Sequence, residues 1–99
     1  MARVRITYWR EIPVLVTARD GAGEATVPLS ARFQELVDGV AMQEGVSDAE
    51  AYLGGWRVGP EEDRGGPAAR AAEAVAAELE ARFGEIRSRT LRAPGPESE

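Results

Sequence analysis

The stretch over residues 4–19, VRITYWREIPVLVTAR, constrains the fold most, because it holds the densest group of β-branched and aromatic residues in the chain. On each side of Arg10-Glu11 the side chains alternate in steps of two, which is the periodicity of a β-strand. Strict alternation places Trp9 on the same face as the neighbouring arginines. Neither turn residue favours positive φ, so a wider turn that reaches Pro13 is predicted between the two strands. Pro13 has no N–H and is expected at a strand start, a bulge or an edge.

Turn residues and helix signals organise the next part of the chain. The sequence DGAG at 20–23 predicts a hairpin between the second strand and a third strand at 25–29. Ser30 fits a helix N-cap. Behind it, an apolar stripe from Phe33 to Ala41 has the spacing of one buried helix face. Gly45 is expected to end this helix.

The second half is predicted to contain two further helices and one short strand. The sequence SDAE at 47–50 has the form of a capping box that opens a short helix through Leu53. WRVG at 56–59 predicts a fourth strand, and PEEDRGG at 60–66 predicts a charged, flexible loop. Pro67 fits the first turn of a helix whose buried stripe runs from Ala72 to Phe83.

These elements predict one α+β domain over residues 1–92. It has two layers, with a three- to four-stranded, mainly antiparallel sheet covered on one face by two to three helices. If the fourth strand pairs in parallel with the third, the crossover between them is expected to be right-handed. Residues 93–99, APGPESE, have no apolar periodicity and are predicted to be a disordered tail.

The amino-acid composition excludes several chemistries. The chain has no Cys, no His and no Lys, which removes thiol nucleophiles, imidazole bases, Schiff-base amines and the usual ligands of transition metals. Glu61, Glu62 and Asp63 lack the spacing of a calcium loop and are interpreted as solvated. We therefore predict no catalytic residue, no metal and no cofactor, and we expect that the protein is not an enzyme.

Charge and hydropathy narrow the range of partners. A net charge of −5 argues against a nucleic-acid binder. No apolar run approaches the ~18 residues of a membrane helix, and no signal-peptide core follows Met1, so a cytoplasmic location without membrane contact is expected. The first twenty residues carry four arginines against two carboxylates. This local basic face is compatible with an anionic ligand or an acidic partner, or with a solvated strand face.

Two Trp-Arg pairs supply the candidate binding residues. They contain the only two tryptophans of the chain. Indole and guanidinium groups suit a flat or anionic ligand, and both are enriched at protein interfaces. The candidate set is Tyr8, Trp9, Arg10, Pro13, Trp56 and Arg57. A shared surface requires that the first and fourth strands lie close together; alternatively, the tryptophans fill the core while the arginines lie separately on the surface.

Three motifs carry a family resemblance over residues 3–58: YWRxIPxxV at 8–16, LSxRFQ at 29–34 and AYLxxWR at 51–57. With these motifs the chain resembles a family of small bacterial proteins, the virulence factor domain family, and the helix around 75–79 resembles that family's last helix more loosely. Members of the family often sit in gene clusters with pterin- or folate-linked one-carbon enzymes. The resemblance therefore implies a cytoplasmic accessory protein of one-carbon transfer, and it supplies no catalytic residues.

Two functions follow as expectations. The first is a non-enzymatic accessory domain that binds a partner protein, such as a pterin- or folate-dependent enzyme, through the Trp-Arg surface. An open sheet edge can accept a partner strand or form a homodimer. The second is a small-ligand binding protein, in which Trp9 or Trp56 stacks on a pterin-like ring and Arg10 or Arg57 holds its anionic tail.

Overall fold

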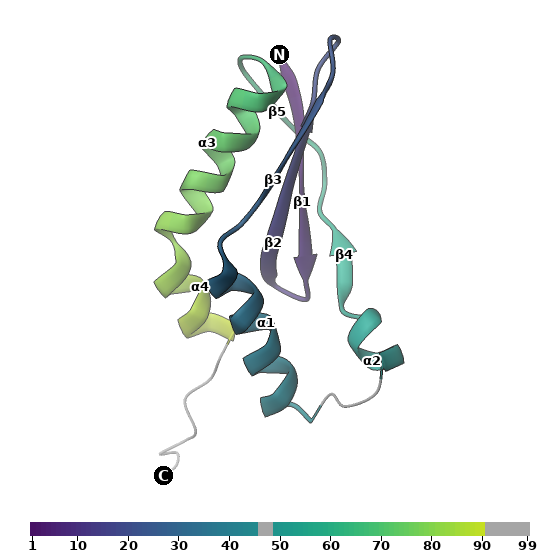
Figure 1. Cartoon of the computed structure of the whole chain (residues 1–99), viewed down its shortest axis with the longest axis vertical. Helices are drawn as coiled ribbons and strands as arrows, with labels where there is room; N and C mark the ends of the chain where they lie inside the picture. The colour runs from purple at the N-terminus through teal and green to yellow at the C-terminus, as the bar shows by residue number, and fades with distance from the viewer. Residues whose placement is uncertain (46–48, 91–99) are drawn as a thin grey trace.

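The computed structural model describes residues 1–45 and 49–90, and Figure 1 shows their arrangement. The strands are β1 (Ala2–Trp9), β2 (Ile12–Arg19), β3 (Glu24–Pro28), β4 (Trp56–Val58) and β5 (Glu62–Arg64). The helices are α1 (Ala31–Gln43), α2 (Ala49–Leu53), α3 (Ala68–Ala81) and α4 (Phe83–Thr90). The predicted α+β class is confirmed. The first two residues of the predicted capping box, the domain boundary at 92 and the predicted tail at 93–99 lie outside the described residues.

The strands form one antiparallel sheet in the order β3-β2-β1-β4, and β5 also pairs with β1. β2 takes one side of β1, so β4 and β5 both lie along its other side, opposite residues 7–9 and 2–4 respectively. Together they make one interrupted edge strand. A parallel pairing of the fourth strand with the third is therefore wrong, because β4 runs antiparallel to β1. The 60–66 segment is also not wholly a loop, since it contains β5.

Helix α3 lies along the sheet and packs against β1, β2 and β3. The apolar residues that alternate along the strands and the apolar stripe of the helix form this contact. Val4 and Val16 from the sheet are buried against the same core as Ala72 and Val75 from the helix. At the alternate positions of β1, Arg3 and Arg5 are exposed. The predicted single last helix is divided at Arg82 into α3 and α4.

A polar side chain, Asp20, fixes the β2–β3 hairpin to the start of α3. Asp20, at the end of the β2–β3 hairpin, accepts hydrogen bonds from Ala22 and Gly23 in its own turn (2.8 and 2.9 Å) and from the backbone N–H of Ala68 (2.7 Å). The N–H of Ala68, followed by those of Ala22 and Gly23, lowers the pKa of Asp20. Asp20 thus satisfies a free N–H of the first turn of α3 from a distant loop, in place of a local N-cap.

The turn between β1 and β2 differs from the predicted wide turn. It contains only Arg10 and Glu11, and Arg10 adopts φ +56°. The backbone N–H of Arg10 donates to the carbonyl of Gly55 (2.7 Å), and its own carbonyl accepts from Nε of Arg57 (2.8 Å). A left-handed arginine is costly by itself, and these two contacts from the β4 region hold it in place. The β1–β2 register also shifts between Thr7 and Tyr8.

Candidate interaction surface

The two Trp-Arg pairs lie side by side on neighbouring strands. In the β1–β4 ladder Trp9 is opposite Trp56, and Tyr8 is opposite Arg57. The structure therefore meets the requirement that the first and fourth strands be adjacent. Four of the six candidate side chains come together at one end of the sheet because of this register.

Trp9 and Pro13, however, are sealed inside the protein. Trp9 is 0% exposed, and Pro13 is among the fully buried side chains. The indole Nε1 of Trp9 donates to the carbonyl of Tyr52 (2.7 Å), and Gly55 lies directly against the indole ring. Alternation alone would leave Trp9 open beside the arginines, but Tyr52 of α2 and Gly55 cover the ring. The side chains of Trp9 and Pro13 are therefore not accessible at the surface.

Tyr52 links the buried indole to the outer one. Its ring centroid lies 5.6 Å from that of Trp9 and 6.1 Å from that of Trp56, the latter in an edge-to-face arrangement. Its hydroxyl lies 3.4 Å from the amide nitrogen of Gln34 on α1. Trp56 is half-buried. The three rings therefore form a continuous series of aromatic contacts from the buried Trp9 to the half-buried Trp56.

The two arginines are anchored, and they do not point separately into solvent. The guanidinium of Arg10 forms an ion pair with Glu44, the C-cap residue of α1, and lies 4.8 Å from the centroid of the Trp9 ring. The guanidinium of Arg57 lies 4.4 Å over the ring of Tyr8. Since Nε of Arg57 also bonds to the turn carbonyl, its position is fixed although the residue is exposed.

Two apolar side chains that the sequence did not single out flank this cluster. Leu53, at the end of α2, is 64% exposed, and Val58 of β4 is 57% exposed. We define the edge surface as Leu53, Trp56, Arg57 and Val58. A three-residue strand is too short to reveal from periodicity which of its faces is covered, so no pattern in the sequence distinguishes Val58 from a core valine.

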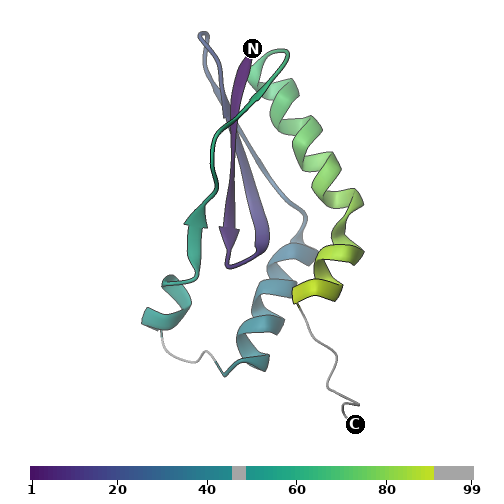
Figure 2. The same ribbon diagram turned by 180° about the vertical axis from the view of Figure 1, so that it is seen from behind.

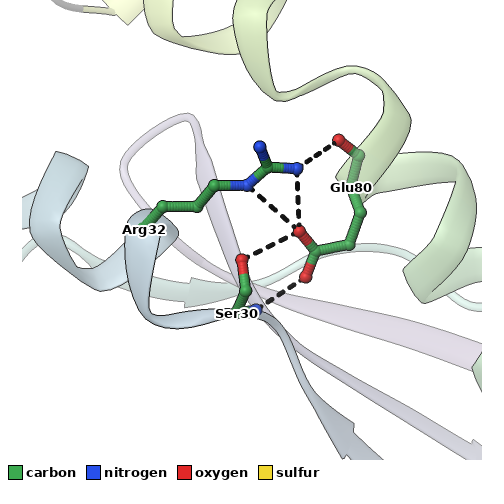
Figure 3. A network of polar contacts seen from close by, with 3 residues as sticks. All are labelled: Ser30, Arg32 and Glu80. Carbon is green, nitrogen blue, oxygen red and sulfur yellow. Dashed lines mark hydrogen bonds and ion pairs between the residues drawn. The ribbon is translucent and has the colours of Figure 1, made fainter.

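A second polar cluster joins α1 to α3 (Figure 3). The carboxylate of Glu80 accepts from the backbone N–H of Ser30 (2.7 Å), from its hydroxyl (2.8 Å) and from Arg32 (3.1 Å). Desolvation raises the pKa of Glu80, but the bonds from Ser30 and Arg32 outweigh it and lower the pKa. Ser30 stands at the predicted N-cap position of α1, yet its side chain makes no cap bond within the helix. Its hydroxyl is used across the domain instead.

Packing beside this cluster shows that it is a structural joint. Phe33 and Phe83 meet edge-to-face with centroids 5.0 Å apart, and the Arg32 guanidinium lies 4.4 Å over the Phe83 ring. Ser30 and Arg32 of the LSxRFQ motif therefore use their polar groups to bond to Glu80 within the domain. We assign this motif to the junction of α1 with α3 and α4.

The arginines of the basic strand face are also largely paired with a carboxylate of the same domain. Glu61 lies 3.5, 3.2 and 3.5 Å from Arg3, Arg5 and Arg19 respectively. Its carboxylate is thus paired, which corrects the expectation of a solvated acidic loop at this residue. Among residues 1–45 and 49–90, no group of His, Cys, Asp and Glu is arranged to hold a metal ion.

No helix in the described part of the chain combines the length and the hydropathy that a membrane crossing requires. The searches of curated proteins and of solved structures gave no match. Residues 7–91, which include all three sequence motifs, match the family described as "Virulence factor". The chain therefore belongs to the Virulence factor family.

Proposed function

We propose that this domain is a non-enzymatic protein-interaction module that binds its partner through the edge surface. The observation that carries the proposal is the exposure of Leu53 and Val58 on either side of Trp56 and Arg57. Trp56 and Val58 share one face of β4, Arg57 takes the other, and aromatic and arginine side chains are the residues enriched at interface hot spots. Exposed apolar side chains beside such residues are typical of interaction sites.

The absence of reactive side chains supports a binding role over catalysis. The sequence has no Cys, His or Lys, and carboxylates near the clusters described above are engaged by arginines, as with Glu44, Glu61 and Glu80. A general acid or base must be able to reach a substrate proton. The arrangement therefore favours a module that recognises another molecule without reacting with it.

The family resemblance supports a more specific proposal, that the partner is a pterin- or folate-dependent enzyme of the cytoplasm. The small-ligand alternative is less favoured, because the buried ring of Trp9 cannot stack on a pterin. Only Trp56 retains an exposed part. Titration with an oxidised and a reduced folate, followed by tryptophan emission with inner-filter correction, separates the two. Saturable quenching that Trp56→Phe abolishes would favour the ligand-binding function.

The interaction proposal is tested by affinity capture followed by reconstitution. The intact domain is used as bait in an extract of the source organism, and each captured protein is then purified and titrated directly against the domain. Trp56→Ala/Arg57→Ala should weaken binding at least about tenfold, as expected for hot-spot residues. Arg70→Ala, an exposed arginine on α3, is the matched control. Equal affinity of both variants for every captured protein would refute the proposal.

A further inference from the structure

Strand β4 presents unpaired backbone groups at the outer edge of the sheet. The carbonyl of Gly55 accepts a bond from the β1–β2 turn (2.7 Å), and the N–H of Gly59 donates one to β1 (2.9 Å). Because alternate residues of an antiparallel strand direct their backbone groups to the same side, the N–H and C=O groups of Trp56 and Val58 point away from β1. Figures 1 and 2 show no described element beside β4 on that side.

We infer that this edge takes an extended segment of a partner protein as an additional antiparallel strand, an inference that rests on the proposed function. The outward groups of Trp56 and Val58 supply main-chain hydrogen bonds, which is how strand addition gains affinity. The side chains of these two residues share one face of β4. An apolar residue of the incoming strand can therefore cover them from that face.

Arg57 decides which kind of segment fits. A strand centred on β4 places one of its residues directly opposite Arg57, in a pair whose side chains are close. The terminal N–H groups of Arg57 make no bond to any residue that the structure describes, since only its Nε is used. A carboxylate on the residue opposite Arg57 can accept hydrogen bonds from these N–H groups. The segment that fits is therefore an acidic residue flanked by apolar ones.

The same position disfavours a second copy of this chain. Antiparallel pairing of β4 with β4 about Arg57 would set two arginines directly opposite one another, and like charges in that position are destabilising. Beyond β4 the sheet edge is also unsuited to pairing with a further strand. Pro60 has no N–H, and β5 has the sequence EDR, whose charges discourage strand pairing. The inferred occupant is thus a short segment of a different protein.

The decisive variant is Val58→Pro, because it removes an outward N–H while the bonds of β4 to β1 remain. Val58→Thr keeps the N–H and the branched shape and is its matched control. Short random peptides displayed on phage are selected against the intact domain, and the enriched peptides are synthesised and titrated. We expect enriched peptides to carry Asp or Glu beside apolar residues. We also expect binding to fall at least about tenfold in Val58→Pro and to change little in Val58→Thr.

Amide hydrogen exchange measures whether the main-chain hydrogen bonds to the added strand form. On addition of a selected peptide, the amides of Trp56 and Val58 should become protected, and the midpoint of thermal unfolding of free Val58→Pro should establish that it folds. Absence of enrichment, equal binding by Val58→Pro, or protection elsewhere would overturn strand addition. Dimerisation of the free domain that Val58→Pro abolishes would overturn it in favour of a second copy. A captured partner that needs Trp56 and tolerates Val58→Pro would leave the proposed function standing and remove only this mode of binding.

Discussion

The contact between Gly55 and Trp9 gives the sharpest test of the fold around the edge surface. A Cβ added at Gly55 would lie 2.6 Å from Nε1 and 2.7 Å from Cε2 of the Trp9 ring, which is about 1 Å short of an ordinary contact. The ring is fully buried and held by its bond to Tyr52, so it cannot move aside freely. Gly55→Ala should therefore strain the core or break that bond.

The expected loss is about 3 kcal/mol if both occur, the middle of a range of about 1–5 kcal/mol. Overpacking of a well-packed core costs about 1–3 kcal/mol, and a buried hydrogen bond left unmade costs about 1–3 kcal/mol. The smaller entropy of an alanine chain when unfolded returns about 0.4–1 kcal/mol. For a domain of this size the midpoint of thermal unfolding should fall by roughly 10–30 °C.

Gly54→Ala is the matched control for this measurement. A Cβ at Gly54 would meet backbone oxygens of Glu50 and Ala51 at 3.4 and 3.6 Å, which is ordinary contact. Its midpoint should stay unchanged or rise slightly. Far-ultraviolet circular dichroism and tryptophan emission should report the same transition for both variants. Equal midpoints for Gly55→Ala and Gly54→Ala would refute the enclosure of Trp9 by this glycine.

Three further predictions concern polar contacts. The folded pKa of Glu80 lies below the ordinary value of 4.5, so its stabilisation is complete above that pH and is lost as pH falls through the folded pKa; Glu80→Gln should flatten this part of the curve of unfolding free energy against pH. Asp20→Ala should speed hydrogen exchange of the Ala68 amide, measured by NMR, whereas unchanged protection would contradict the distant cap. Arg64 and Glu78 form a forked pair at 2.9 and 2.8 Å, but both are partly exposed; a double-mutant cycle should give a coupling of no more than about 1 kcal/mol.

Periodicity predicted most of the sheet and helices because burial follows it in the longer elements. The alternation in β2 and the stripe of α3 each extend over several residues that contact one core, as Val16 and Val75 do. Strand β5 was not predictable in this way. Its sequence EDR has no apolar face, and it is a strand because its backbone pairs with β1. The break of the last helix at Arg82 was likewise not predictable, because it precedes Gly84, the nearest helix-weakening residue.

The candidate site was predictable in its location but not in its depth. Aromatic and arginine composition identified Trp9 and Trp56, and the β1–β4 register places them opposite one another. Which indole is covered depends on Tyr52 of α2, 43 residues further along the chain, and on the close approach of Gly55. Local sequence does not contain that information. The exposure of Leu53 and Val58 depends on the same tertiary arrangement.

The left-handed turn at Arg10 makes closure of the first hairpin depend on the docking of β4. An isolated arginine at φ +56° carries a cost of about 1–2 kcal/mol, and the bonds that offset it come from Gly55 and Arg57. The first hairpin therefore lacks a locally favourable turn and should close in the same kinetic step as the docking of β4. Non-local steps of this kind slow folding. Arg10→Gly should release the first hairpin from this dependence and increase the refolding rate in stopped-flow measurements.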